Sequence, residues 1–202
     1  MAPLNPPQRS GLRRELRDRR SALSPQQRAT ASRAITEHVG ATRWLRAGRP
    51  VGMYASIGVE VDTAALRALA RRRQCPVYLP CIVDYRRRHM VFARDIGSLP
   101  TANRLGIPEP EPRDSVPARS LAVVLLPILG FDDHGTRLGT GGGYYDRLFS
   151  YRRHRQSWHR PLLVGIAFRC QRVALITREP HDVPLDAVVT EDGVRMFNGA
   201  SA

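Results

Sequence analysis

The sequence predicts an α/β fold: a single-domain three-layer sandwich with a largely parallel central sheet. Short apolar segments typical of buried strands alternate with helical segments, which is the pattern of sheets whose strands are joined by helices. The chain has 202 residues, 42% of them hydrophobic. This length suits one domain with a proper core and is too short for two. We therefore expect one domain over residues 1–202, with 1–8 disordered and 198–202 a tail.

Two helices are expected near the start of the chain. Residues 10–23 carry leucines on one side among charged residues, which is the spacing of an amphipathic helix. The next helix begins at "SPQQ", where Ser24 can cap it, Pro25 fits the first turn and Gln27 completes a capping box. It should run to about His38.

Six apolar segments predict the strands, and a third helix at residues 62–73 separates the first two, with Asp62 or Thr63 as its cap. The strands are expected at Pro50–Ser56, 76–80, 89–94, Leu121–Pro127, Pro161–Phe168 and Asp186–Glu191. Ligands of such folds bind outside the carboxyl ends of the strands. The loops of interest are those after Tyr54, Leu79, Leu126 and Phe168.

Charge is the most unusual feature of the composition. The net charge is +14, and all 32 basic residues are arginines, because the chain contains no lysine. Such an excess suits an anionic partner, and nucleic acid is one candidate. No apolar run approaches the ~18–20 residues that span a bilayer. Three cysteines without a CxxC pair favour a reducing cytoplasm, and the polar segment Arg152–Arg160 should be exposed.

The stretch "RLGTGGGYYDRLF", Arg137 to Phe149, is the strongest candidate for a site. It is not a Walker A loop, because no GK[ST] ends it, and it is not a dinucleotide fingerprint, because Tyr144 stands where the third glycine is required. Successive glycines nevertheless let backbone N–H groups converge on an anion. Asp146 would contact phosphate only through a magnesium ion.

Other interpretations of these residues remain open from the sequence alone. The glycines could form a flexible hinge with Asp146 capping a helix, although two adjacent tyrosines are unusual in a flexible linker. Glu60 could face a cleft or lie solvated in a loop. The acids of "HDVPLD", residues 181–186, could be turn residues, caps or metal ligands, and "LGIPEPEP", residues 105–112, could be a lid or a connector.

Several segments together resemble the 5-formyltetrahydrofolate cyclo-ligase family, also called methenyltetrahydrofolate synthetase. They are "RSGLRRELRDRRSALSPQQR", "YASIGVEVDT", "HMVFAR", "LGIPEPEP", "GFDDHGTRLGTGGGYYDRLF" and "FRCQRVALITREPHDVPLDAVVTEDG", in order along nearly the whole chain. The resemblance implies ATP-dependent closure of 5-formyltetrahydrofolate to 5,10-methenyltetrahydrofolate, with ADP and phosphate released and Mg²⁺ required. It also implies a cytoplasmic enzyme acting on small molecules, which we expect to be a monomer without a membrane or nucleic-acid partner.

The resemblance also implies site residues. It places the ATP site at Arg9, Ser10, Gly11, Leu12, Arg13, Arg137, Leu138, Gly139, Thr140, Gly141, Gly142, Gly143, Tyr144 and Tyr145. It places folate contacts at Ala55, Glu60, Met90, Tyr144 and Tyr145. The implied magnesium ligands are Asp146 and Asp182, and the implied catalytic charges are Arg137 and Arg147.

One departure from the family pattern bears on the nucleotide. The family usually has lysine where this chain has Arg9, so a compact ammonium group is replaced by a planar guanidinium with a fixed fork of donors. The charge also motivates a rival hypothesis, a non-catalytic nucleotide-binding paralogue with a basic RNA-binding surface. Intact Asp146, Asp182 and Glu60 argue against the loss of catalysis.

Overall fold

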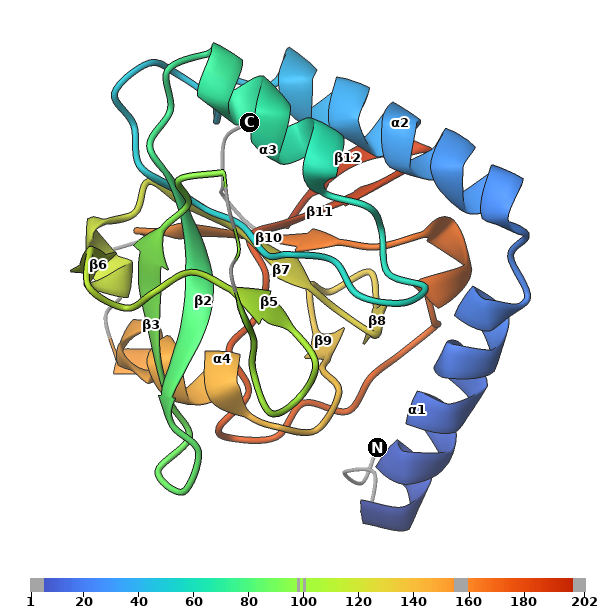
Figure 1. The fold of residues 1–202 in the computed structure, drawn as a ribbon. Coiled ribbons are helices and arrows are strands. Elements are labelled where there is room, and N and C mark those ends of the chain that lie inside the picture. Colours follow the sequence, from blue (N-terminus) through green and yellow to red (C-terminus); the bar gives the residue numbers. More distant parts are fainter. Residues whose placement is uncertain (1–5, 98, 100, 155–159, 198–202) are drawn as a thin grey trace.

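An eight-stranded sheet forms the centre of the computed structural model, which describes residues 6–97, 99, 101–154 and 160–197 (Figure 1). Its order is β12-β11-β10-β7-β1-β2-β3-β6. The bounds are β1 Val51–Gly52, β2 Val77–Asp84, β3 His89–Arg94, β6 Ser115–Val116, β7 Val123–Pro127, β10 Leu162–Ile166, β11 Ala187–Thr190 and β12 Gly193–Met196. β11, β10, β7, β1 and β2 are parallel, and antiparallel strands flank them. The expected α/β class with a largely parallel sheet is confirmed.

Helices and short elements cover the sheet on both faces. α2 (Pro25–Ala41) and α3 (Ala64–Arg72) lie on one face, and α4 (Tyr144–Leu148) lies towards the other (Figure 1). Three short 3₁₀ helices accompany them: η1 Ala118–Ser120, η2 Ser150–His154 and η3 Arg169–Gln171. Two small sheets pair β4 (Thr101–Ala102) with β5 (Pro108–Glu109), and β8 (Gly130–Phe131) with β9 (Arg137–Leu138).

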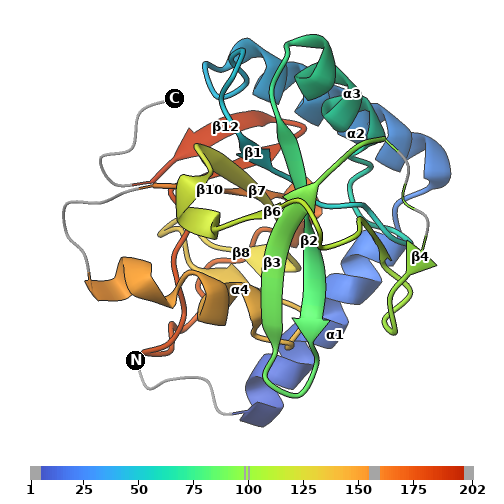
Figure 2. The same ribbon diagram turned by 60° about the vertical axis from the view of Figure 1, so that its left-hand side comes forward.

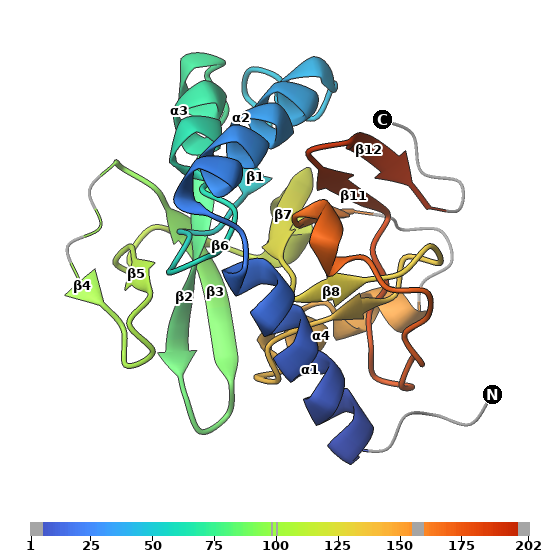
Figure 3. The same cartoon turned by 90° about the vertical axis from the view of Figure 1, so that its right-hand side faces the viewer.

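The first helix, α1 (Pro6–Ser21), does not lie on either face of the sheet. It passes beside β8 and β9, as Figure 3 shows. Leu16 is fully buried there against Leu129, Leu138 and Ile176, which form a small hydrophobic cluster apart from the two larger ones that flank the sheet. A single leucine therefore sets which side of α1 faces the rest of the protein.

The predicted α2 start is confirmed in detail. Ser24 Oγ accepts a hydrogen bond from the Gln27 backbone N–H at 3.2 Å, and the Ser24 N–H donates to Gln27 Oε1 at 2.8 Å. Reciprocal bonds of this kind satisfy two of the free N–H groups at a helix start. For α3, the side chain that caps is Asp62, whose Oδ1 accepts from the Ala64 N–H at 2.9 Å.

Three expectations were wrong in their extent. The chain is helical from Pro6, so residues 6–8 are not disordered as expected, while residues 1–5 and 198–202 lie outside the described part. The first strand pairs only at Val51–Gly52, because the chain leaves the sheet after Met53. In the segment Arg152–Arg160, Arg153 and Arg160 are exposed as expected, but Arg152 is not, because its Nη2 donates to Asp186 Oδ1 at 2.8 Å; residues 155–159 lie outside the described part.

The topology marks one place for a ligand. From β1 the parallel strands continue to β2 on one side, and from β7 they continue to β10 and β11 on the other. The chain therefore reverses its winding direction between β1 and β7, and crevices form beyond the carboxyl ends of strands at such a point. The β2–β3 hairpin extends beyond the sheet at the same end (Figure 2).

Candidate active site

A cavity of about 520 Å³ lies beyond β1 and β7, at the reversal of the sheet. Its size falls in the range of small-molecule sites. α1, the loop after β1, strands β2 and β3, the loop before β5, the glycine stretch and residues 179–182 all contribute to its walls. One cavity therefore gathers segments from the beginning, middle and end of the chain.

The glycine stretch forms one wall of the cavity, and α1 holds it in place. Arg13 Nε donates to the Gly139 carbonyl at 3.1 Å. Gly141 has φ +110° and Gly143 has φ +67°, backbone conformations that side chains strongly disfavour. The loop is thus a specific turn that glycine forms without strain and that exposes backbone, which argues against the interpretation as a flexible hinge.

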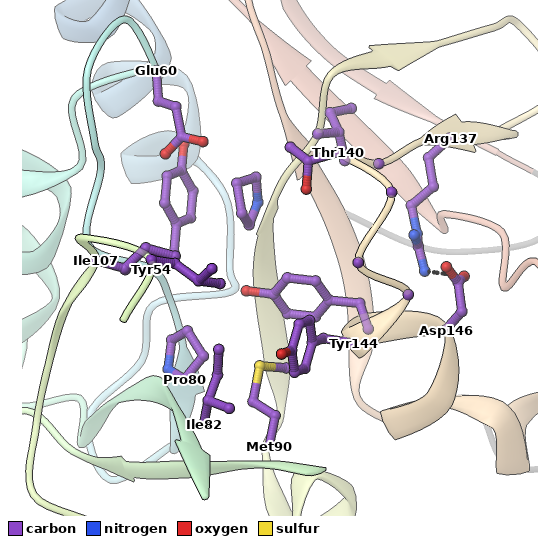
Figure 4. Close-up of a pocket in the computed structure, with 18 of the residues that line it drawn as sticks. Tyr54, Glu60, Pro80, Ile82, Met90, Ile107, Arg137, Thr140, Tyr144 and Asp146 are labelled. Atoms are coloured by element: carbon purple, nitrogen blue, oxygen red, sulfur yellow. Dashed lines mark hydrogen bonds and ion pairs between the residues drawn. The ribbon is translucent and has the colours of Figure 1, made fainter. Parts of the chain in front are cut away.

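Asp146 lies directly behind this loop, paired with an arginine (Figure 4). Arg137 Nη2 donates to Asp146 Oδ1 at 2.6 Å, and the same oxygen accepts from the Val183 N–H at 3.1 Å. The second contact brings Asp146 next to the 179–182 segment, although 37 positions separate Val183 from Asp146. The two predicted magnesium ligands, Asp146 and Asp182, therefore lie in neighbouring parts of one wall.

A second arginine neutralises Asp182. Arg9 Nη2 donates to Asp182 Oδ2 at 3.0 Å, and Arg9 Nη1 lies 2.7 Å from Glu179 Oε1. Burial works against the charged guanidinium, but its hydrogen bonds to Glu179 and Asp182 outweigh this, so the pKa of Arg9 is raised. Glu179, His181 and Asp182 offer ligand atoms within 4.8 Å of one another, a donor set of carboxylates and imidazole that could hold a metal ion.

Glu60 marks the opposite side of the cavity, facing the glycine loop in Figure 4. Its Oε2 accepts from the Ile57 N–H at 3.2 Å. Burial raises the pKa of the Glu60 carboxyl, and the charge of Glu60 adds to burial in raising the pKa of Tyr145. A carboxylate in this position can accept hydrogen bonds from paired N–H donors of a ligand.

Apolar side chains separate the two polar ends. Pro80, Ile82, Met90 and Ile107 line the cavity between Glu60 and the glycine loop, together with Tyr144 and Tyr145 (Figure 4). Such a surface suits a flat heteroaromatic ring, because ligand sites are mostly apolar with a few placed polar groups.

The loop before β5 is fastened to the sheet edge beside the cavity. Glu109 Oε2 accepts from the Ile82 N–H at 3.2 Å and from Asn103 Nδ2 at 2.9 Å. Burial and the Glu109 carboxylate raise the pKa of the Cys81 thiol to about 11. Leu105, at the tip of this loop, is 55% exposed and lines the cavity. The segment is therefore a wall of the cavity rather than a remote connector.

Most of the residues expected at the site are brought together. The residues that line the cavity are Arg9, Arg13, Ala55, Glu60, Met90, Arg137, Gly139, Thr140, Gly141, Gly142, Gly143, Tyr144, Tyr145, Asp146 and Asp182.

Five expected residues do not line it. Leu12 and Leu138 pack in the small cluster around Leu16, and Ser10 and Gly11 lie exposed on α1. Arg147 is exposed because the helical turn of α4 directs it away from the side on which Asp146 meets Arg137. Its position gives no support to the expected catalytic role.

Other residues of the cavity were missed by sequence reasoning. Arg20, Tyr54 and Glu179 all line it. Arg20 is one of six basic residues between positions 9 and 20, and nothing in the sequence distinguishes it. Glu179 lies three residues before Asp182, so attention to acids near "HDVPLD" could have identified it.

Comparisons with known proteins agree on one family. The model of the 5-formyltetrahydrofolate cyclo-ligase family matches residues 5–191. The 5-formyltetrahydrofolate cyclo-ligase of Haemophilus influenzae is 31% identical over 187 residues, covering 90% of this chain and 97% of its own. That of Escherichia coli is 33% identical over 182 residues, covering 89% and 98%.

A solved structure shows the same fold. The NMR structure of Aquifex aeolicus 5,10-methenyltetrahydrofolate synthetase matches with a TM-score of 0.79 at 26% identity, covering 96% of this chain and 95% of that one. The alternative of a non-catalytic RNA-binding paralogue receives no support from these relatives. The chain therefore belongs to the 5-formyltetrahydrofolate cyclo-ligase family and is an enzyme that closes 5-formyltetrahydrofolate to 5,10-methenyltetrahydrofolate with ATP as co-substrate.

Proposed function

We propose that the two ends of the cavity divide the two substrates between them. The phosphates of ATP bind among Arg9, Arg13, Arg137 and the glycine loop, and the pterin of 5-formyltetrahydrofolate binds between Glu60 and the tyrosines. The observation that carries this division is the cavity itself, with basic and glycine-rich walls at one end and a half-buried carboxylate, beyond apolar side chains, at the other.

The phosphate end fits a polyanion. Burial, followed by repulsion from Arg9 and Arg17, lowers the pKa of Arg13, which shows how closely these positive charges are gathered. Exposed backbone at Gly139 to Gly143 adds N–H donors without side-chain obstruction. An incoming phosphate would relieve the mutual repulsion of the arginines.

The acids beside the phosphates fit Mg²⁺, which we propose is held by Asp146 and Asp182. Carboxylate oxygens are the preferred ligands of this hard cation. Both acids are paired with arginines in this structure, Asp146 with Arg137 and Asp182 with Arg9. When bound, the metal would neutralise charge on the transferring phosphoryl group. Each arginine could then exchange its carboxylate partner for a phosphate oxygen.

The chemistry then needs alignment more than acid–base help. The γ-phosphoryl group of ATP transfers to the formyl oxygen, and ADP departs. The folate's N10 attacks the activated formyl carbon, loses its proton, and phosphate leaves with the former formyl oxygen. Arg137 and Arg9 can stabilise charge on the transferring group, while Glu60 fixes the pterin so that the formyl oxygen faces the phosphates.

The test follows formation of the methenyl chromophore with 5-formyltetrahydrofolate, ATP and MgCl₂, comparing the native chain with Asp146→Ala and Asp133→Asn. Asp133 is an exposed acid paired with Arg172 and Arg195, and it does not line the cavity, so it controls for the loss of a negative charge. We expect Asp146→Ala to lose turnover and its stabilisation by Mg²⁺ with ADP in thermal unfolding. Unchanged magnesium-dependent turnover in Asp146→Ala would refute the proposed metal site.

We also propose that the enzyme acts as a monomer in the cytoplasm. Cys75, Cys81 and Cys170 are free thiols, as a reducing compartment would keep them. None of the helices in the described ranges is both long and apolar enough to cross a bilayer. Light scattering at several protein concentrations, with and without ATP, tests the monomer, and a mass of twice 22.6 kDa would contradict it.

A further inference from the structure

α1 presents a row of arginines to the cavity. Arg9, Arg13 and Arg20 all line it. At 3.6 residues per turn, positions separated by four and eleven fall on nearly the same face of a helix. Leu16 lies on this side as well and is fully buried, so the row is fixed in its orientation. From Arg9 to Arg20 the helix rises about 16 Å, which takes the row from the acids towards the Glu60 end.

Two of these arginines have clear roles, and Arg20 has none so far. Arg9 pairs with acids, and Arg13 holds the glycine loop. Within the part of the chain that the structure describes, the Arg20 side chain makes no hydrogen bond or ion pair, and its Nε is buried without an acceptor. Leaving a buried donor unsatisfied costs about 1–3 kcal/mol, so native proteins rarely retain one without a use.

The same feature recurs at the nucleotide end. In the described ranges, three arginines have a buried Nε without an acceptor: Arg9, Arg20 and Arg137. All three line the cavity. A fourth arginine, Arg152, has an unsatisfied buried Nη1 and lies outside the cavity, so the coincidence with the ligand site holds for the buried Nε donors alone. Arg9 and Arg137 belong to the proposed phosphate site, which leaves Arg20 as a donor without an assigned ligand atom.

Arg20 lies at the pterin end. Its charge acts on Glu60 and Tyr54, lowering the pKa of each against the larger effect of burial, yet it hydrogen-bonds neither. A gap between a carboxylate and a guanidinium that both line one cavity can hold a ligand group that needs both an acceptor and a donor. A pterin is such a group, because its 2-amino and N3–H donors stand beside the O4 acceptor.

We propose that Arg20 is a positioning residue for the folate, donating a hydrogen bond to O4 of the pterin while Glu60 accepts from the 2-amino and N3–H groups. This inference rests on the proposed placement of the folate at Glu60. Because O4 neighbours N5, which carries the formyl group, a bond at O4 also restricts how the formyl oxygen meets ATP. Arg20 extends the role of α1 from the nucleotide to the second substrate.

The experiment measures binding of 5-formyltetrahydrofolate without ATP, by calorimetry, to the native chain, Arg20→Ala and Arg14→Ala. Arg14 is an exposed arginine on the same helix, outside the cavity, so its loss removes the same charge without the contact. We expect Arg20→Ala to weaken folate binding about tenfold to a hundredfold, as for a lost hydrogen bond to a charged group. ADP affinity should be unchanged in both variants, and the melting temperature of ligand-free Arg20→Ala should not fall, because the substitution removes a buried unsatisfied donor.

A second ligand separates the pterin from the tail. The ligand 5-formyl-6-methyltetrahydropterin lacks the aminobenzoylglutamate. We expect Arg20→Ala to weaken its binding by the same factor as the binding of the complete folate. A loss seen only with the complete folate would assign Arg20 to the glutamate carboxylate and overturn the proposal.

Glu60→Gln distinguishes the two levels of the inference. If Glu60→Gln weakens folate binding and Arg20→Ala does not, the folate placement stands and the role of Arg20 is refuted. If neither variant weakens binding, the folate placement itself fails, and the role of Arg20 fails with it.

Discussion

The pairing of Arg9 with Asp182 predicts a stability effect that a double-mutant cycle can isolate. Arg9 and Asp182 are each only 6% exposed. Arg9→Met keeps most of the volume of the side chain and removes its charge, leaving Asp182 buried without its cation. Removing one partner of a buried ion pair typically costs 3–5 kcal/mol, whereas replacing both partners is often close to neutral.

The structure indicates that Arg9→Met lowers the free energy of unfolding by an amount near the lower limit of that range of about 3–5 kcal/mol. Asp182 Oδ2 keeps a hydrogen bond from the Glu179 N–H at 2.9 Å, and the Glu179 side chain is 30% exposed and can be hydrated. We therefore expect Arg9→Met to lose about 3 kcal/mol. In a chain of this length, that corresponds to a melting temperature lower by roughly 6–12 °C. The double variant Arg9→Met/Asp182→Asn should lie within about 1 kcal/mol of the native chain.

The assay is urea unfolding of the four chains of the cycle at neutral pH, without ligands. A loss in the double variant equal to the sum of the single losses would show that the two side chains are not coupled, and the reasoning would be wrong. Repetition at higher NaCl concentration gives a second check, because a buried pair is screened much less than an exposed one. Asp133→Asn, in an exposed pair, is the control that salt should affect.

Two further variants address the cavity walls. Gly141→Ala should raise KM for ATP and lower the free energy of unfolding by about 1–3 kcal/mol, because a residue with a side chain is strained at φ +110°. The matched control is Gly139→Ala, at a position with ordinary φ and no atom near the added Cβ. Equal KM values in the two variants would contradict the strain argument. Glu60→Gln should have a higher free energy of unfolding than the native chain at pH 7. Burial raises the pKa of Glu60 in the folded state, so the folded native chain loses stability as rising pH ionises this carboxyl, whereas glutamine stays neutral. This difference in the free energy of unfolding should vanish below the ordinary glutamate pKa of 4.5. Chemical unfolding across this pH range measures it, and a difference that does not change with pH would contradict the effect of burial.

The sequence was most informative where one local pattern decides the structure. The capping box at Ser24 and Gln27 depends on four consecutive residues, and it appears as predicted. β3, at residues 89–94, also has the predicted bounds. The family motifs similarly identified the glycine loop, Glu60 and both acids of the proposed metal site as residues that line one cavity.

The sequence was least informative where tertiary contacts decide. The apolar run at 50–56 predicts a long strand, but only Val51–Gly52 pair with both neighbours, because the chain then turns out of the sheet to form the cavity wall at Tyr54 and Ala55. Arg20 differs from the other arginines of α1 only in what it faces, and packing of Leu16 decides this. The leucine spacing indicates which side of α1 is buried, but no local pattern tells which segments will cover it or line the cavity beside it.

The contact between Arg9 and Asp182 also determines when the site can form during synthesis. These residues stand 173 positions apart, so the nucleotide end of the cavity lacks Asp182 until position 182 has left the ribosome. Until then α1 lacks the ion pairs of Arg9 and has only its contacts with earlier segments, such as those of Arg13 with Gly139 and of Leu16 with Leu129. By itself, a helix of 16 residues is only marginally stable in water. The pairing of the first helix with the loop before β11 is therefore a late step of folding, and ATP can assist this step only in chains that already contain that loop.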